Sequence, residues 1–357
     1  MRNAGTLPLA QMHDRPRTRS DGRASVAGRM VLTALVAVWA SKAIPSGSPV
    51  PTSPAALPPP YRVFAGQSFE PSAAAFDPAT GRVLVLSDHD STLYRYELRA
   101  GALVRPQGER HEPLWLPDGA VAKLEALTRL PSGDFLAVTA FDRPDPSFRR
   151  VVRFSYHPAA PVEAVPVPVD DAALSAAVRA ATGLPWFKIE GVAVDPTGTR
   201  VLFGVRSVGE SYVAPQDVVL VVRCPLADDR VGAPEAVIRL STAEALGGRA
   251  EGLSDLQLDA GGDSFLLLTS HEAGEWTPEA HSGDLFRVPA GVLLGAAPQA
   301  PVPLGEPVRR FRAKPEGLAV EPSGALVVVF DDDREWKRLF AGYEQSDGLF
   351  ALIDARS

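Results

Sequence analysis

The chain repeats one arrangement of apolar and polar positions. In each copy a short apolar segment starts at a polar residue, usually a Glu, and passes through a turn rich in Pro and Gly. It returns as a second apolar segment that ends in charged residues, and the clearest copy runs from Lys314 to Asp333. The marker residues lie 53 to 65 residues apart and are Ser72 (in a degraded copy), Glu125, Glu190, Glu251 and Glu316. A repeat of this length made of short strands is typical of a propeller or another repeat array.

Each copy continues with a third apolar segment, and the first four copies add a weaker fourth one. The expected third strands are 92–96, 151–154, 218–222, 285–288 and 349–353, and the expected fourth strands are 102–104, 164–167, 236–239 and 301–304. Four antiparallel strands make one propeller blade. The sequence therefore predicts an all-β fold, a single β-propeller with five four-stranded blades. Six blades stay open as an alternative if the insertions at 99–121 and 159–186 contain further strands.

Two segments fall outside the repeat. Residues 61–64 precede the first copy, and the last copy has no fourth strand of its own. We expect residues 61–64 to supply that outer strand and close the ring, because closure removes an exposed strand edge. Residues 170–184 start at an Asp and reach a Gly near their end, which predicts one inserted helix.

The N-terminal part differs in composition from the repeats. Residues 1–43 combine a basic start, an uncharged apolar run at 30–40 and small residues after it, the pattern of a secretory signal peptide. The long basic start also fits an uncleaved N-terminal anchor. Residues 44–60 are rich in Pro and Ser, as in a stiff linker, and residues 61–357 form the propeller domain. We expect an exported protein, periplasmic or extracellular, that touches a membrane only through an uncleaved N-terminal segment.

Charge and cysteine content narrow the possible functions. The formal net charge of −7 argues against nucleic acid as a partner, because phosphate binding needs a basic surface. The single cysteine, Cys224, excludes an intramolecular disulfide and a zinc cluster built on several cysteines. It lies in an apolar segment, so we expect a buried, inert thiol.

The repeat gathers charged residues at one opening of the channel. In a blade, the start of the first strand and the end of the antiparallel second strand lie at the same end, which we call the mouth. The marker residues Glu125, Glu190, Glu251 and Glu316 are therefore expected there, together with the strand-two ends Asp88, His89, Arg206, His271 and Asp331. A basic residue stands two positions before each Glu and points to the same side of the strand; these residues are Lys123, Lys188, Arg249 and Lys314.

Four carboxylates at one mouth would repel one another. At about 8 Å and an effective dielectric constant near 20, each pair costs roughly 2 kcal/mol. The Lys and Arg partners can neutralise them as a ring of ion pairs, and a raised pKa can keep one Glu protonated. A hard cation such as Ca²⁺ is the remaining alternative, since it takes oxygen ligands; its expected ligands are Glu125, Glu190, Glu251, Glu316 and Asp331.

The segments 314–324 and 188–198 resemble those of bacterial exported β-propellers. The resemblance is strongest to the esterase-like phytase group and neighbouring uncharacterised propeller families, and it covers about residues 61–357. The chain is more distantly similar to the gluconolactonase and senescence-marker propellers, in which a Glu that opens a strand binds a divalent cation. The resemblance implies the fold. It does not distinguish one of the four glutamates as the metal ligand.

Two functions are compatible with these observations. The first is binding of a small or polymeric ligand at the charged mouth, with Lys123, Lys188, Arg249, Lys314, Asp88 and His89 as ligand-binding residues. The second is metal-dependent hydrolysis of phosphate esters or lactones, in which the cation would polarise the substrate and activate water. In that case Arg206 or one of the lysines at the mouth would bind the anion, and His271 or His89 would act as a general acid or base.

Overall fold

The computed structural model describes residues 61–64, 70–88, 92–107, 112–113, 115–116, 119–158, 160–272, 281–331 and 348–354. The expected signal or anchor at 1–43, the linker at 44–60 and His89 lie outside these residues. No helix within the described ranges is long and apolar enough to cross a membrane.

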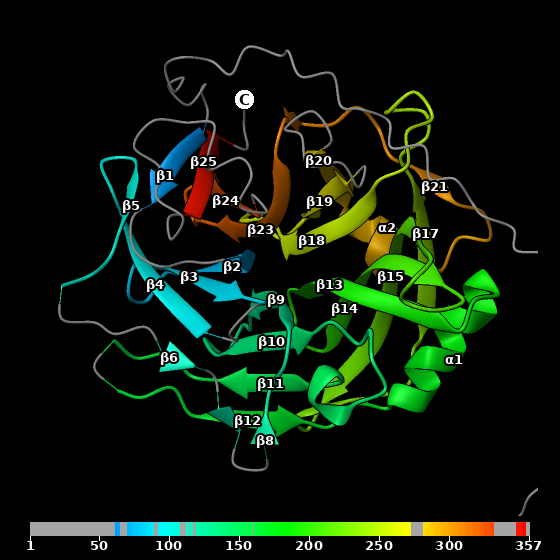
Figure 1. The fold of residues 1–357 in the computed structure, drawn as a ribbon, viewed down its shortest axis with the longest axis horizontal. Helices are drawn as coiled ribbons and strands as arrows, with labels where there is room; N and C mark the ends of the chain where they lie inside the picture. Colours follow the sequence, from blue (N-terminus) through cyan, green and yellow to red (C-terminus); the bar gives the residue numbers. More distant parts are fainter. Residues whose placement is uncertain are drawn as a thin grey trace, which may run out of the picture. The chain divides into compact units, whose positions relative to one another are not determined.

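The described residues form a five-bladed β-propeller, as the repeat predicts (Figure 1). The first blade contains β2 (Pro71–Asp77), β3 (Arg82–Ser87), β4 (Thr92–Arg99) and β5 (Ala102–Val104). The second contains β9 (Leu124–Arg129), β10 (Phe135–Thr139), β11 (Val151–Phe154) and β12 (Ala164–Val167). The third contains β13 (Trp186–Val194), β14 (Arg200–Gly209), β15 (Pro215–Ala227) and β17 (Ala236–Ser241).

The last two blades complete the ring. The fourth contains β18 (Gly252–Leu258), β19 (Ser264–Glu272), β20 (His281–Pro289) and β22 (Arg309–Phe311). The fifth contains β23 (Lys314–Val320), β24 (Ala325–Asp331), β25 (Gly348–Asp354) and β1 (Tyr61–Phe64). The first strands of successive blades contact one another around the whole ring, from β2 through β9, β13, β18 and β23 back to β2. These five strands therefore surround the central channel.

The N-terminal strand closes the ring as expected. β1 pairs antiparallel with β25, so that Tyr61 lies opposite Ala351 and Phe64 lies opposite Gly348. The fifth blade is thus built from both ends of the repeat region, and the pairing of β1 with β25 joins those two ends.

The prediction that residues 301–304 form the outer strand of the fourth blade is wrong. β22 occupies that place, and its Phe311 is buried edge-on against Phe330 with ring centroids 5.3 Å apart. β21 (Val302–Pro303) instead pairs parallel with β17 of the third blade. Since proline has no N–H to donate, a segment with two prolines suits this short edge position better than a full outer strand.

The insertions add small elements and no sixth blade within the described residues. The elements are β6 (Glu112–Pro113), β7 (Trp115–Leu116), β8 (Gly119–Ala120), β16 (Arg230–Val231), the 3₁₀ turn Pro146–Phe148 and the helices α1 (Asp171–Thr182) and α2 (Ala290–Leu294). The predicted inserted helix is confirmed as α1. Its Asp170 side chain accepts a hydrogen bond from the Ala173 N–H at 3.0 Å, and Gly183 ends it at φ 79°.

Apolar side chains fill the interfaces between blades. Cys224 is 1 % exposed within the apolar cluster that the second and third blades share, which confirms the buried thiol. Burial raises the pKa of this thiol to about 12, so it stays protonated.

The closest approach of two inner strands tolerates only a glycine. A Cβ on Gly317 of β23 would lie 2.6 Å from backbone atoms of Ala73 and Ala74 in β2. We predict that Gly317→Ala lowers the free energy of unfolding by about 1–3 kcal/mol, because backbone cannot move aside as a side chain can. Chemical denaturation measures this. Gly305→Ala is the matched control, since nothing lies within 4 Å of its added Cβ; equal stability of the two variants would contradict the prediction.

Candidate functional site

A bulge near the start of each inner strand sets which residue points into the mouth. The strand pairing skips one residue in every blade, and the skipped residues are Ser72, Glu125, Glu190, Ser254 and Glu316. A bulge of this kind redirects the extra side chain. In four blades it falls on the marker residue of the repeat. In the fourth blade it falls on Ser254, three residues after Glu251.

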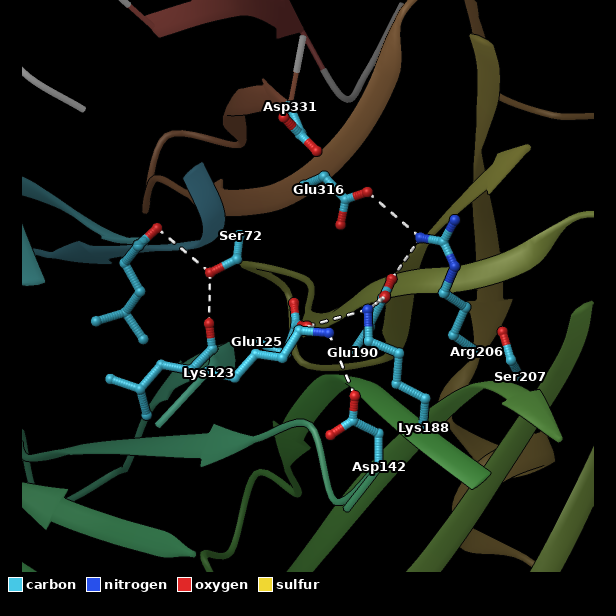
Figure 2. A network of polar contacts seen from close by, with 12 residues as sticks. Ser72, Lys123, Glu125, Asp142, Lys188, Glu190, Arg206, Ser207, Glu316 and Asp331 are labelled. Atoms are coloured by element: carbon cyan, nitrogen blue, oxygen red, sulfur yellow. Dashed lines mark hydrogen bonds and ion pairs between the residues drawn. The ribbon is translucent and has the colours of Figure 1, made fainter. Parts of the chain in front are cut away.

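The structure therefore does not bring all four glutamates into one ring. Glu125, Glu190 and Glu316 belong to one network of ion pairs at the mouth, which Figure 2 shows with Ser72 beside them. Glu251 belongs to a separate group, in which it accepts a hydrogen bond from Thr269 and forms an ion pair with Arg249. The Glu-Gly-Leu motif predicts that Glu251 lies with the other three glutamates at the mouth. In the structure, the strand register of the fourth blade places it apart from them.

The mouth network alternates between acids and bases without interruption. Its members in order are Asp142, Lys123, Glu125, Lys188, Glu190, Arg206, Glu316, Lys314 and Asp331. Lys188 Nζ lies 3.0 Å from Glu125 Oε1 and also contacts Glu190. Arg206 Nη1 lies 2.5 Å from Glu190 Oε2 and 3.3 Å from Glu316 Oε1, so it connects the third blade to the fifth. The ion-pair ring expected from the sequence is present along this path.

Asp88 marks the place where the alternation stops. It lies in the first blade at the end of β3 and experiences the charges of Glu125 and Asp331, the neighbours at either side of the break. The first blade has Ser72 in place of a Glu and no Lys before it. Burial raises the pKa of Asp88 to about 8, and repulsion from Glu125 and Asp331 adds to the shift.

The acids along the network differ in protonation. Burial opposes ionisation of Glu190, but Arg206 and Lys188 outweigh it and lower its pKa to about 2. Burial raises the pKa of Glu316 to about 8; Glu190 adds to this shift, while Lys314 and Arg206 act against it. Burial also disfavours the ammonium of Lys188, yet Glu125 and Glu190 raise its pKa overall. Asp88 and Glu316 are thus the acids of the mouth with raised pKa values, whereas that of Glu190 is lowered.

A buried polar group connects the inner strands of three blades. Asp255 is fully buried and accepts hydrogen bonds from the Leu318 N–H at 2.7 Å and the Leu256 N–H at 2.6 Å. Gln257 donates to Asp255 and to the Leu127 carbonyl oxygen at 2.7 Å. Burial raises the pKa of Asp255 well above its usual range. These contacts join the second, fourth and fifth blades.

The cavity at the mouth has a volume of about 510 Å³. Its basic lining residues are Lys123, Arg143, Lys188, Arg206 and Lys314, its acidic ones are Asp142, Glu190 and Asp217, and Trp186 and Tyr212 contribute aromatic rings. Lysine side chains are more exposed than the glutamates: 25 % for Lys123 against 2 % for Glu125. A ligand that enters therefore meets ammonium groups first and carboxylates beneath them.

Two cavity residues are held in fixed positions. The Trp186 Nε1–H donates to the Asp142 carbonyl oxygen at 2.7 Å, which sets the orientation of the indole. Arg143 lies over the Phe148 ring at 4.5 Å. Trp186 was not found from the sequence, because it precedes the repeated motif and the end of the inserted helix gave no signal for it.

Some expected site residues lie elsewhere. His271 is half-buried at the end of β19, opposite Ser282, and does not line the cavity. Arg249 lies with Glu251 and Asp284, at 2.6 and 3.0 Å from their carboxylate oxygens. The roles proposed for these residues stay predictions.

The comparisons with known proteins assign neither a family nor a function to this chain. No protein-family profile matches the chain, and no curated protein matches it. Among solved structures, the chain is similar to a PQQ-bound aldose sugar dehydrogenase from Streptomyces coelicolor, at 16 % identity over 84 % of this chain and 99 % of that one, with a TM-score of 0.39. A luciferin-regenerating enzyme matches at 10 % identity over 82 % and 95 % of the chains, with a TM-score of 0.42. The allergen Mala s 1 of Malassezia sympodialis matches at 13 % identity over 79 % and 80 %, with a TM-score of 0.41. These likenesses are too low to carry a function to this chain.

The raised pKa of Glu316 makes stability depend on pH. The unfolded chain releases this proton near pH 4.5, whereas the folded protein holds it to about pH 8, so this residue makes the folded state less stable as pH rises between those values. Gln cannot ionise. We predict that Glu316→Gln removes this part of the pH dependence and is more stable than the parent protein at pH 8, by on the order of a few kcal/mol.

Denaturant unfolding at pH 5, 6.5 and 8 measures the effect. Glu306→Gln, in a side chain that is 82 % exposed, serves as the control and should follow the parent protein at each pH. Parallel pH curves for Glu316→Gln and the parent protein would show that Glu316 is ionised in the folded state.

Proposed function

We propose that the protein binds a small anionic ligand at the mouth of the propeller. The observation that carries the proposal is the layering of charge in the 510 Å³ cavity, where Lys123, Lys188 and Lys314 stand above more deeply buried glutamates. Carboxylate or phosphate oxygens of a ligand are the natural acceptors for these ammonium groups. Tyr212, 69 % exposed at the tip of the β14–β15 hairpin, and the fixed ring of Trp186 offer an apolar wall for the rest of the ligand.

The buried acids suit this role because they keep the lysines in place. An ammonium with carboxylates beneath it is held in one orientation, and the network then costs little to reorganise when a ligand arrives. The carboxylates also limit the net positive charge, which favours a small anion over a polyanion. Export of the protein, inferred from residues 1–43, belongs to the same proposal and would place the ligand outside the cytoplasm.

Lys123 is the position at which to test binding. Its side chain is the most exposed of the three, and its loss leaves Glu125 paired with Lys188 at 3.0 Å. We predict that Lys123→Gln weakens binding of the tightest anion from a calorimetric panel of citrate, glucose 6-phosphate, glucuronate and inorganic phosphate by at least about tenfold, or 1.4 kcal/mol.

Arg179→Gln is the control, because Arg179 lies exposed on α1 and does not line the cavity. It should bind like the parent protein. Equal loss of affinity in both variants would point to a general effect of charge, and no binding of any anion by the parent protein would count against the proposed function.

A second candidate is a divalent cation at the break in the network, with hydrolysis of phosphate esters or lactones as the activity. The observation that favours it is Asp88, a carboxyl between Glu125 and Asp331 with its pKa raised by both. A cation there would supply the missing positive charge and take oxygen ligands. No group of three His, Cys, Asp or Glu side chains within the described ranges is arranged to hold a metal ion. Such a cation would therefore draw further ligands from water or from the bound anion, and the resemblance to phytase-like propellers fits this version.

Calcium provides the test of the second candidate. We predict that saturating Ca²⁺ raises the stability of the full-length protein by about 2–3 kcal/mol at a hundredfold excess over the dissociation constant, and that a chelator reverses the gain. Asp88→Asn should abolish the response. Asp228→Asn, in an exposed turn, should retain it. Equal melting curves in calcium and chelator would remove the cation from the proposal.

A further inference from the structure

A second cavity, of about 340 Å³, lies next to the mouth. It is bounded by the start of β15, the end of β17 and the segment that leads into β18. Asp217 lines both cavities and accepts a hydrogen bond from Ser207 at 3.2 Å, so it separates them. The volume falls within the range of about 300–1,000 Å³ that is usual for small-molecule sites.

The lining of this cavity combines an apolar base with basic groups, and it also includes the acids Asp217 and Glu251. Val219, Leu220 and Leu240 are buried and supply the apolar part, while Arg239 and Arg249 stand at the rim with exposed side chains. Arg239 forms no ion pair with another described residue. An apolar pocket with a few convergent polar groups is the usual form of a ligand site, and the two guanidinium groups select for negative charge.

Arg249 is held in position by ion pairs with two acids. Its Nη2 lies 2.6 Å from Glu251 Oε1 and 3.0 Å from Asp284 Oδ2, and both acids have fully buried side chains. The Arg249 side chain is 40 % exposed, and its guanidinium has five N–H donors, more than these two acids occupy.

The charges around Arg249 are mixed. Burial raises the pKa of Glu251 to about 7 and also raises that of Asp284, which lessens the negative charge of this pair. Arg310 Nε lies 3.9 Å from Asp284 Oδ1 and adds a second positive charge to this group. Asp217 is a further acid in the lining, so an anion would bind at the part of the rim where Arg249 and Arg239 stand.

We propose that this cavity is a second ligand site, separate from the mouth, which binds a small amphipathic anion: a carboxylate or sulfonate carried on an apolar group. The anionic group pairs with Arg249 and Arg239, and the apolar group lies against Val219 and Leu240. This site needs neither the lysines of the mouth nor a cation at Asp88.

The probe for this site is 8-anilinonaphthalene-1-sulfonate, whose sulfonate and aromatic rings match the two parts of the cavity and whose fluorescence rises in apolar surroundings. We expect the full-length protein to bind one molecule of the probe. Arg249→Gln should weaken binding at least tenfold. Ala243→Trp places a large side chain at an exposed lining position and should abolish binding without changing the core.

Two control variants distinguish binding in this cavity from binding at the mouth and from a general effect of an added ring. Ala176→Trp adds the same ring at an exposed position of α1 away from the cavity, and Lys123→Gln alters the mouth alone; both should bind the probe like the parent protein. Circular dichroism and melting curves confirm that each variant is folded. Undiminished binding to folded Ala243→Trp overturns the proposal, as does the absence of any binding to the parent protein. Loss of binding in Lys123→Gln would assign the probe to the mouth instead.

Discussion

The ion pairs of Arg206 are the interaction on which the mouth depends. Arg206 is 6 % exposed, and it holds Glu190 of its own blade and Glu316 of the fifth blade with one nitrogen. Removal of three glutamates from water is costly, and the cost is recovered only when cations and hydrogen bonds meet each carboxylate. Without Arg206, Glu190 would retain Lys188 and Glu316 would retain Lys314, but the ion pair of Arg206 with Glu316 that connects the third blade to the fifth would be lost. The network is therefore both a seal between blades and the frame of the cavity.

The bulges explain why these particular side chains meet. A regular strand would alternate its side chains between its two faces, and a residue on the wrong face would enter an interface between blades. The residue at the bulge does not follow this alternation, and its side chain points toward the mouth. Gly317 and Gly191 follow the bulges at Glu316 and Glu190, where a Cβ would collide with the adjacent inner strand. In these two blades the Gly of the Glu-Gly pair therefore lets the next inner strand approach at the bulge.

Much of the fold could be predicted from sequence because the repeat is periodic. Blade number, ring closure by residues 61–64 and the helix at α1 all follow from hydrophobic pattern, turn residues and caps, which are local signals. The sequence predicts less of the candidate site than of the fold. The i, i+2 pairing of each base with its Glu is local and was predicted, whereas the displacement of Glu251 depends on the position of the bulge at Ser254, which depends on pairing with β19. Trp186 and Asp217 reach their cavities through the third blade's long hairpin and the inserted helix, and no repeat position marks either of them.

The blade that departs from the repeated sequence pattern differs from the others in its charge. In the first blade the marker is Ser72, whose hydroxyl donates to the Leu124 carbonyl oxygen at 2.6 Å and so joins two inner strands without adding charge. The charge absent from Ser72 reappears at Asp88, at the end of the neighbouring strand. Lys188 and Lys123 lower the pKa of Asp88, but burial and the charges of Glu125 and Asp331 outweigh them. A group that brings positive charge, whether a proton, a metal ion or an ammonium of a ligand, is most stabilised there, because two further carboxylates, Glu125 and Asp331, bear on the same point.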